Sequence, residues 1–341
     1  MTDTLLEVRN LRTSFPTRDG IVRAVSGIDL TVARGASIGI VGESGSGKSV
    51  TNLTIMGLVP SPPAVIEADA ISFEGVDLLT MRESRRRHLR GNRMAMIFQD
   101  PMTSLNPFLR IGEQLTEPLL VHGKASRRAA KDRAMTLLRE VGIPDAERCM
   151  RAYPHQFSGG MRQRVMIAMA LTCEPALLIA DEPTTALDVT IQAQILEQMQ
   201  RIRQEHGTAI VLITHDLGVA AGFCDEIHVM YAGKIVEEAA TDDLFAQPRH
   251  PYTEALLRSV PRLDDETKAE FLPIRGAPPD LSQLPPGCSF APRCDYRLDR
   301  CERVEPMLEP VEGRDSRRKS CHVDITRTQP VAANSTEESV P

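Results

Sequence analysis

Gly42-Glu-Ser-Gly-Ser-Gly-Lys48-Ser49 follows directly on an apolar run, Ala36–Val41, that has the length of a buried strand. The segment matches the pattern G-x-x-x-x-G-K-[ST], in which small residues let the backbone curve around a phosphate group. The amide groups at the start of the helix that follows add to the attraction for an anion. We therefore predict a strand, a phosphate-binding loop and a helix beginning near Lys48, and we expect these residues to surround the phosphates: Gly42, Glu43, Ser44, Gly45, Ser46, Gly47, Lys48 and Ser49.

Two side chains of this segment have the chemistry to bind a nucleoside triphosphate. Lys48 supplies a mobile positive charge for the β- and γ-phosphates, and Ser49 supplies a hydroxyl for Mg²⁺. Farther along, an apolar run that predicts a strand ends in Asp181 and Glu182. Because neighbouring side chains of a strand point in different directions, these carboxylates should have different roles. We expect Asp181 to hold Mg²⁺, directly or through water, and Glu182 to orient or deprotonate an attacking water.

The remaining pattern predicts an α/β fold. The apolar runs 176–180 and 209–213 alternate with helical segments, which indicates a parallel sheet covered on both faces. Leu5–Leu11 and Val22–Val32 alternate as expected for an antiparallel pair of strands. Residues 100–158 contain helical periodicity and read as an insertion. We predict a P-loop NTPase fold with a parallel core sheet, an antiparallel β-subdomain, a helical insertion and a small irregular C-terminal appendage rich in cysteine.

Composition and charge narrow the classes of function. The 341 residues carry 40 basic and 46 acidic side chains, so no pervasive positive field attracts nucleic acid. Aromatic residues make up only 4% of the chain, too few for a surface that stacks single-stranded bases. No stretch approaches the roughly 18 consecutive apolar residues of a transmembrane helix, and the N-terminus has no basic-then-apolar signal pattern. We therefore expect a cytoplasmic chain without a nucleic-acid partner.

Shifts in composition indicate three parts. Residues 1–247 contain the phosphate loop, the predicted strands and the helical insertion of about 100–158, and form the expected nucleotide-binding domain. Prolines become frequent after residue 247, and four of the seven cysteines follow, so we expect residues 248–325 to form a small extension. Residues 326–341 have the composition of a disordered tail.

A second turn suited to an anion occurs at Ser158-Gly-Gly-Met-Arg-Gln163. A helix beginning near Gly160 would expose a serine hydroxyl and glycine amides at its N-terminus. One chain cannot bring this turn and the phosphate loop to the same nucleotide if the two lie far apart in the fold. Two chains arranged head to tail could do so, each placing its serine-glycine turn on the nucleotide of the other.

Together these motifs resemble those of the ATP-binding cassette (ABC) ATPases, in the order of that family and over about residues 5–245. The resemblance implies hydrolysis of ATP with Mg²⁺, in a pocket completed by a second ATPase subunit. The serine-glycine turn is similar to the family's signature motif, which contacts the ATP of the partner subunit, with a methionine in place of the frequent glutamine: Ser158, Gly159, Gly160 and Met161.

The same resemblance implies roles for residues that no local pattern assigns. Gln99 looks like the Q-loop glutamine, which touches Mg²⁺ or the attacking water and senses the membrane partner. Asp188 matches the D-loop at the dimer interface. His215 is similar to the switch histidine that contacts the γ-phosphate, so that Glu182 and His215 are the implied catalytic residues. Phe15 lies where the family places an aromatic ring that stacks on adenine.

Four further segments carry a narrower resemblance to the ATPase subunits of oligopeptide, dipeptide and nickel importers: Gln99-Asp-Pro-Met-Thr-Ser-Leu-Asn-Pro107, His250-Pro-Tyr-Thr253, Gly276-Ala-Pro-Pro-Asp280 and Pro286-Gly-Cys-Ser-Phe-Ala-Pro-Arg-Cys294. This resemblance implies ATP-driven uptake of di- or oligopeptides at the cytoplasmic face of the cell membrane. The implied partners are two transmembrane permeases, a second, related ATPase subunit and an extracytoplasmic solute-binding protein. Nickel import is one alternative. A soluble ABC ATPase outside transport is another, although that class usually carries two cassettes or coiled-coil inserts.

Four cysteines of the extension could share one ligand. Cys288, Cys294, Cys301 and Cys321 are separated by five, six and nineteen residues and lack the tight pairs of a zinc ribbon. Four thiolates can hold Zn²⁺ or a 4Fe–4S cluster, and unliganded thiols are the third interpretation. The resemblance to importer ATPases with a similar tail implies the iron–sulfur cluster. Such a group would stabilise a Pro-rich segment that has little core of its own.

Overall fold

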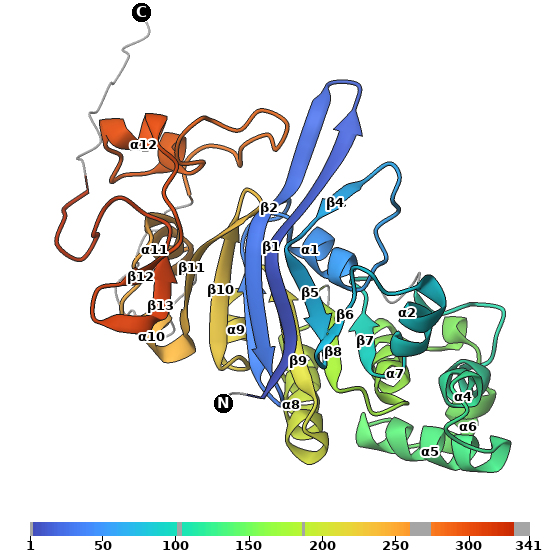
Figure 1. The fold of residues 1–341 in the computed structure, drawn as a ribbon. Helices are drawn as coiled ribbons and strands as arrows, with labels where there is room; N and C mark the ends of the chain where they lie inside the picture. The colour runs from blue at the N-terminus through green and yellow to red at the C-terminus, as the bar shows by residue number, and fades with distance from the viewer. Residues whose placement is uncertain (1–2, 101–103, 186–187, 260–273, 331–341) are drawn as a thin grey trace, which may run out of the picture.

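The computed structural model describes residues 3–100, 104–185, 188–259 and 274–330. Its centre is an eight-stranded sheet in the order β12-β13-β11-β10-β3-β9-β8-β7 (Figure 1). β11 (Lys234–Ala240) runs antiparallel to β10. The parallel core that the sequence predicted is confirmed by five neighbouring strands: β10 (Glu226–Tyr231), β3 (Ser37–Val41), β9 (Ala209–Thr214), β8 (Leu177–Asp181) and β7 (Met94–Ile97).

The central strands bury side chains on both faces of this sheet. In β8, Leu178 and Ala180 join one apolar cluster, whereas Leu177 and Ile179 join another on the opposite face. Every residue of β3, β8 and β9 is buried, which explains why these strands are continuous apolar runs rather than alternating ones. Their carboxyl ends are therefore held firmly, and the residues that follow those ends have defined positions.

A second, antiparallel sheet forms the predicted β-subdomain. Its longest strands, β1 (Thr4–Thr17) and β2 (Gly20–Ala33), pair along their whole length. The hydroxyls of Thr13 in β1 and Thr54 in helix α1 lie 3.0 Å apart and connect this sheet to the cassette core. The shorter strands of the sheet are β4 (Val65–Glu67), β5 (Ala70–Phe73) and β6 (Val76–Asp77).

Helices surround the main sheet, and a group of them forms the predicted insertion. In that group, α5 begins after Ser126, whose hydroxyl accepts a hydrogen bond from the amide of Ala129. Among the described residues, no helix combines the length and apolar character needed to cross a membrane. The insertion contains α4 (Ile111–Val121), α5 (Arg127–Glu140), α6 (Ala146–Arg151) and the short helix η1 (Pro154–Gln156); the other helices before residue 247 are α1 (Lys48–Ile55), α2 (Glu83–Leu89), α7 (Gly159–Leu171), α8 (Val189–His206), α9 (Leu217–Ala221) and α10 (Thr241–Ala246).

The C-terminal extension is more regular than the sequence predicted, and it joins the main sheet. β13 pairs with β11, so the extension lengthens the sheet of the cassette at its edge (Figure 1). The predicted tail begins with a turn in which Thr326 is bonded to Asp324, and residues 331–341 lie outside the described residues. The elements of the extension are α11 (Pro251–Arg258), η2 (Ala291–Arg293), α12 (Asp299–Arg303), β12 (Glu309–Val311) and β13 (Arg314–Lys319).

Candidate nucleotide site

The phosphate loop has the geometry that its glycines predicted. It connects β3 to α1, and two of its glycines lie against other backbone segments. A Cβ on Gly42 would come within 2.1 Å of the carbonyl oxygen of Met230. Gly47 has a φ of +103° and a Cβ there would lie 2.2 Å from the carbonyl oxygen of Ala24. Only glycine fits at these two positions, because the loop lies directly against the backbone of β10 and of β2.

Lys48 lies inside the loop with only 5% of its surface exposed. Its Nζ donates to the carbonyl oxygens of Gly42 at 2.7 Å and Glu43 at 2.9 Å. Burial lowers the pKa of Lys48, although Glu182, Asp181 and Glu43 oppose this shift. The ammonium group is therefore held by weak carbonyl partners at the position where a phosphate would be a stronger one.

Ser49 and Asp181 come together as a candidate Mg²⁺ site. Ser49 is in the first turn of α1, Asp181 ends β8, and Ser49 Oγ donates to Asp181 Oδ1 at 3.1 Å. Burial raises the pKa of Asp181 above its ordinary value, and the hydrogen bond from Ser49 partly offsets that effect. A hydroxyl and a carboxylate are the oxygen donors that Mg²⁺ takes in P-loop proteins.

The carboxylate of Glu182 contacts three side chains, which lie in the segments that follow β7, β8 and β9. Its carboxylate accepts hydrogen bonds from Gln99 Nε2 at 3.0 Å and from Thr185 Oγ1 at 2.9 Å, and His215 Nδ1 lies 3.3 Å away. Gln99 follows β7, Glu182 follows β8 and His215 follows β9, so the parallel order of these strands brings the residues together. Thr185 is a contact that the sequence did not predict.

The environment of Glu182 keeps its side chain ionised. Burial by itself would raise the pKa of Glu182, but the hydrogen bonds from Thr185 and His215 outweigh burial and lower it. The backbone of Glu182 also has a φ of +46°, an unusual value for a residue with a side chain. Such backbone strain is concentrated at functional sites, where the surroundings enforce it.

The other predicted residues lie on separate elements. Ser158 begins α7, where its hydroxyl accepts from the amide of Met161 at 3.4 Å, and Gly160 packs beside Ile191 of α8. Asp188 begins α8 and accepts from the amide of Ile191 at 2.9 Å. Ala186 and Leu187, the first residues of the predicted D-loop, lie outside the described residues.

Phe15 is half-buried in β1, opposite Val22 of β2. It lies on the antiparallel sheet, which Gly233 connects to the phosphate loop. The carbonyl of Gly233 accepts a hydrogen bond from the amide of Ser26 in β2, and its amide donates to the carbonyl of Ser46 in the loop. Stacking of Phe15 on adenine stays a prediction.

Sequence reasoning missed the contacts that the C-terminal extension makes with the phosphate loop. The guanidinium of Arg293 pairs with both carboxylate oxygens of Glu43, at 2.6 and 2.9 Å. The hydroxyl of Tyr252 accepts a hydrogen bond from the amide of Glu43 at 2.8 Å. Both residues belong to segments that the sequence had singled out, but their partners lie 209 and 250 residues away, and no local pattern reports such a contact.

The four cysteines of the extension do come together. Cys288, Cys294, Cys301 and Cys321 line one small cavity of about 10 Å³. Cys294 Sγ accepts from the amide of Tyr296 at 3.3 Å, and Cys321 Sγ from the amide of Val323 at 3.4 Å. Over the part of the chain that the structure describes, however, no group of three or more His, Cys, Asp or Glu side chains has the arrangement of a formed metal site.

Comparison with known proteins agrees with this architecture. Residues 25–185 match the ABC transporter family, and residues 236–301 match the C-terminal region of oligopeptide/dipeptide transporters. The oligopeptide transport ATP-binding protein AppD of Bacillus subtilis is 53% identical over 305 residues, which cover 89% of this chain and 93% of AppD. The oligopeptide transport ATP-binding protein OppD of Salmonella typhimurium is 51% identical over 310 residues, covering 91% and 92% of the two chains.

Solved structures show the same cassette. A dimeric ATP-binding cassette in a post-hydrolysis state, bound to ADP and Pi, aligns with a TM-score of 0.62 at 27% identity and covers 70% of this chain and 99% of its own. CbiO1 of Clostridium perfringens, part of an ABC transporter complex, aligns with a TM-score of 0.60 at 27% identity and covers 72% and 92%. The fold and the site thus define an ABC-type ATPase. Within that class, the chain belongs to the family of oligopeptide and dipeptide transport ATP-binding proteins.

Proposed function

We propose that this chain hydrolyses ATP to drive the uptake of di- or oligopeptides, as a peripheral subunit at the cytoplasmic face of the cell membrane. The observation that carries the proposal is the convergence of Gln99 and His215 on Glu182, beside the pair of Ser49 and Asp181. The relatives named for peptide transport supply the substrate class.

Within one chain, the residues divide the work of hydrolysis. The loop amides and Lys48 bind the β- and γ-phosphates, and Lys48 exchanges its present carbonyl partners for phosphate oxygens. Ser49, Asp181 and Gln99 would hold Mg²⁺, which would neutralise charge on the phosphates when bound. Glu182 is ionised and orients a water for attack, accepting its proton, while His215 contacts the γ-phosphate.

The signature turn completes the pocket of a second subunit in this proposal. Ser158 precedes α7, next to the helical insertion, whereas Lys48 begins α1, which contacts β1 and β2 of the antiparallel sheet (Figure 1). ATP would join two ATPase subunits, with each nucleotide bound by the loop of one subunit and the turn of the other. The partner can be an identical or a related chain, since this chain carries residues of both halves of the proposed composite site.

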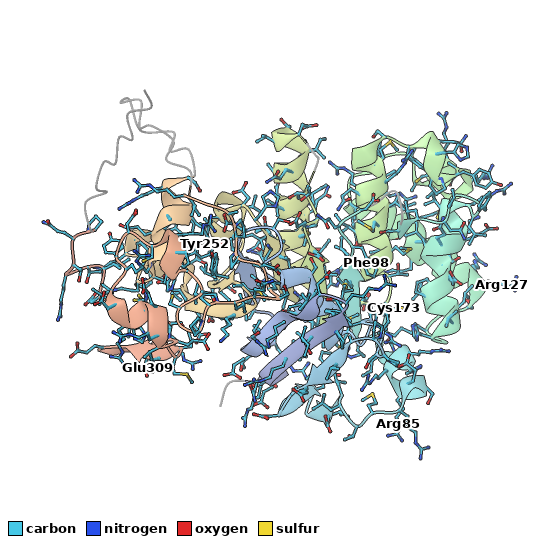
Figure 2. The ribbon with its side chains drawn as sticks, turned by 90° about the horizontal axis from the view of Figure 1, so that it is seen from above. Arg85, Phe98, Arg127, Cys173, Tyr252 and Glu309 are labelled. Carbon is cyan, nitrogen blue, oxygen red and sulfur yellow. The ribbon has the colours of Figure 1, made fainter. Side chains whose placement is uncertain are left out.

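A groove beside Gln99 supports contact with a transmembrane permease. It has a volume of about 640 Å³ and is lined by methionine and other apolar side chains, including Met96, Met166 and Met169. Phe98 adds a ring that is 43% exposed (Figure 2). Because Phe98 precedes Gln99, a permease segment in this groove would be coupled directly to the partner of Glu182. An extracytoplasmic solute-binding protein completes the proposed importer.

The four-cysteine cavity is proposed to hold a 4Fe–4S cluster, with Zn²⁺ as the alternative. Two observations support this proposal: the four cysteines line one cavity, and the sulfurs of Cys294 and Cys321 accept amide hydrogen bonds, which are typical around cluster sulfurs. Burial raises the pKa of Cys294 to about 12 and of Cys321 to about 11, so these thiols need a bound cation to ionise. A cavity of about 10 Å³ holds about one water, so the loops would have to spread to admit a cluster.

Metal analysis of protein purified without oxygen tests this assignment. We expect a brown protein with about four irons per chain, because each thiolate of a four-cysteine site binds one iron. Cys294→Ser should remove the colour and most of the iron. Cys149→Ser is the matched control, since Cys149 is buried in the helical insertion away from the cavity. A colourless protein with stoichiometric zinc would contradict the cluster.

Glu182→Gln tests the proposed function. The variant keeps an acceptor for Gln99 and Thr185 but loses the negative charge, so MgATP should bind as before while turnover falls by about a hundredfold or more. Binding is measured by calorimetry and turnover by phosphate release. Lys48→Ala is the comparison, since it should weaken MgATP binding itself. Turnover by Glu182→Gln within threefold of the native rate would remove Glu182 from the mechanism. Loss of peptide uptake by the assembled transporter, with the permeases present, tests the substrate class.

A further inference from the structure

Arg293 connects the extension to the cassette through several hydrogen bonds. Its side chain is 5% exposed, although arginine is usually a surface residue. Nη1 and Nη2 pair with the two oxygens of Glu43, and Nη1 also lies 3.3 Å from the hydroxyl of Tyr231. Nε donates to the carbonyl oxygen of Arg275 at 2.8 Å. A two-point pairing of this kind fixes the orientation of the carboxylate as well as its position.

Three aromatic rings hold this arrangement in place. Tyr231 ends β10 in the cassette, Tyr252 lies in α11, and Phe290 precedes η2 in the extension. Their ring centroids are 4.6 to 5.3 Å apart, and the guanidinium of Arg293 lies 5.8 Å from the ring of Tyr231. Tyr252 occupies the junction of the extension with the cassette (Figure 2). The cluster therefore fixes the extension at one position relative to the phosphate loop.

Every polar group of Glu43 is held, and the partners of its carboxylate and of its amide belong to the extension. Its carboxylate binds Arg293, its amide donates to the Tyr252 hydroxyl, and its carbonyl accepts from Lys48. The last contact matters for chemistry, because Lys48 is the cation of the loop. The extension thus acts on the residue that positions Lys48.

The charge of Glu43 gives the pairing a second consequence. Glu43 follows Gly42 in a loop that must accept a triphosphate, and a free carboxylate there would repel it. In a site of reduced dielectric this repulsion is stronger than in water. Arg293 offsets the charge and turns the carboxylate toward the extension.

We propose that Arg293 and Tyr252 are positioning residues for ATP: from the C-terminal extension they neutralise and orient Glu43, and so set the affinity of the phosphate loop for MgATP. Neither side chain is needed to touch the nucleotide. The inference rests on the proposed role of residues 42–49 as the nucleotide loop. It predicts that the extension controls nucleotide affinity and not only the stability of the chain.

The test measures MgATP and MgADP affinity of the full-length chain by calorimetry, and KM and kcat in the assembled transporter. Arg293→Ala should weaken MgATP binding by about tenfold, a size typical of coupling between contacting charges, with kcat changed by less than about threefold. MgADP, with less charge, should lose less affinity than MgATP. Arg293→Lys, which keeps the charge but not the two-point pairing, should bind MgATP with an affinity between those of the native chain and Arg293→Ala. Tyr252→Phe keeps the ring packing and should raise the Kd by about threefold, since it removes one hydrogen bond.

Glu43→Gln separates a charge effect from a folding effect. In the Glu43→Gln background there is no carboxylate to neutralise, so adding Arg293→Ala should weaken MgATP binding by less than about threefold. Arg297→Ala is the matched control, because Arg297 lies in the same segment with its side chain 52% exposed, and it should bind MgATP like the native chain. Circular dichroism confirms that each variant is folded.

Two results would overturn the inference. One is a folded Arg293→Ala variant, together with Tyr252→Phe, that binds MgATP within twofold of the native affinity. The other is an equal loss of affinity from Arg293→Ala in the native and Glu43→Gln backgrounds, which would make Arg293 a structural residue. Lys48→Ala distinguishes these failures from failure of the proposed loop. If Lys48→Ala also binds MgATP normally, the nucleotide site itself is wrongly placed.

Discussion

Thr185 shows how much of the function of Glu182 depends on a neighbour three residues along the chain. Its hydroxyl donates to the same oxygen, Oε2, that accepts from Gln99. Two donors on one oxygen leave Oε1, beside His215, as the less occupied acceptor. A water bound for attack is therefore expected at Oε1, and Thr185 sets the rotamer that points this oxygen toward it.

Thr185→Val removes the hydroxyl and keeps the shape of the side chain. Because the hydrogen bond helps to lower the pKa of Glu182, its loss should raise that pKa and loosen the carboxylate. We expect kcat to fall by about tenfold, near the lower end for a lost positioning contact, with KM for MgATP unchanged. Thr185→Ser keeps the donor and should restore most of the rate. Phosphate release over a range of MgATP concentrations gives kcat and KM for both variants. A rise in KM with kcat unchanged would argue against a positioning role.

The predicted site residues Lys48, Asp181 and His215 share one property. Each follows or ends a strand that is recognisable by its continuous apolar run, so its place at the edge of the sheet follows from the topology. Arg293 and Tyr252 have no such strand beside them. Their contact with Glu43 depends on how a Pro-rich segment folds back across the cassette, and that path leaves no periodic signal in the sequence.

Among the elements, β13 is one that sequence patterns could not reveal. Its residues, Arg314–Lys319, are all polar, and neither strand alternation nor an apolar run is present. It forms a strand because Arg317 is buried against Glu237 of β11, at 1% and 0% exposure. Glu237 also accepts from the amides of Arg249 and His250. An ion pair here replaces the apolar contact by which a strand is usually recognised.

Arg317→Met tests that account. It leaves Glu237 buried without its cation, so we expect the free energy of unfolding to fall by about 3 kcal/mol, as for other broken buried pairs. The control is Arg318→Met in the next position, whose partner Glu238 lies at 3.1 Å and whose side chain is 33% exposed. That change should cost less than about 1 kcal/mol. Urea unfolding at pH 7 compares the two variants, and equal midpoints would show that the buried pair contributes no more to stability than the partly exposed pair.

Glu74 connects three strands through two arginines and gives a pH-dependent test at the scale of elements. It follows β5 and pairs with Arg93, which precedes β7, and with Arg34, which follows β2. The hydrogen bond from Arg93, against the opposing effect of burial, lowers the pKa of Glu74 below its ordinary value of 4.5. The pairing therefore stabilises the fold above the unfolded pKa, and this stability is lost as pH falls through the lower, folded pKa.

Glu74→Gln should consequently destabilise the chain at pH 7 by about 1 kcal/mol, the upper range for a partly exposed pair. The difference from the native chain should persist down to pH 5 and shrink below pH 4.5, where the unfolded glutamate takes up a proton, until at lower pH the folded glutamate is neutral as well. Thermal or urea unfolding across this range measures it. Glu67→Gln, an exposed glutamate of β4, is the comparison that should show no such trend. A difference that stays constant through pH 4 would exclude a charge effect.

At the scale of the whole molecule, the proposed cycle depends on a second ATPase subunit. Ser158 precedes α7 and Lys48 begins α1, so the two residues belong to different elements of one chain. In the proposed function, ATP would bind the loop of one subunit and the serine-glycine turn of the other, and hydrolysis would release the two subunits. The similar ATP-binding cassette in a post-hydrolysis state, bound to ADP and Pi, is dimeric.

Glu182→Gln makes this association measurable, because ATP that is not hydrolysed keeps the subunits together. Multi-angle light scattering should show the variant, with its partner ATPase subunit where that is a distinct chain, moving from monomer to dimer when MgATP is added and not when MgADP is added. Adding Ser158→Arg places a bulky charge at the start of α7 and should abolish the shift, while calorimetry still detects MgATP on the separate subunits. Arg128→Ala, on the exposed face of α5, is the control that should dimerise normally. If a chain that stays monomeric throughout the assay hydrolyses MgATP at the full rate, the composite site is excluded, since Lys48, Glu182 and His215 of one chain would then be sufficient.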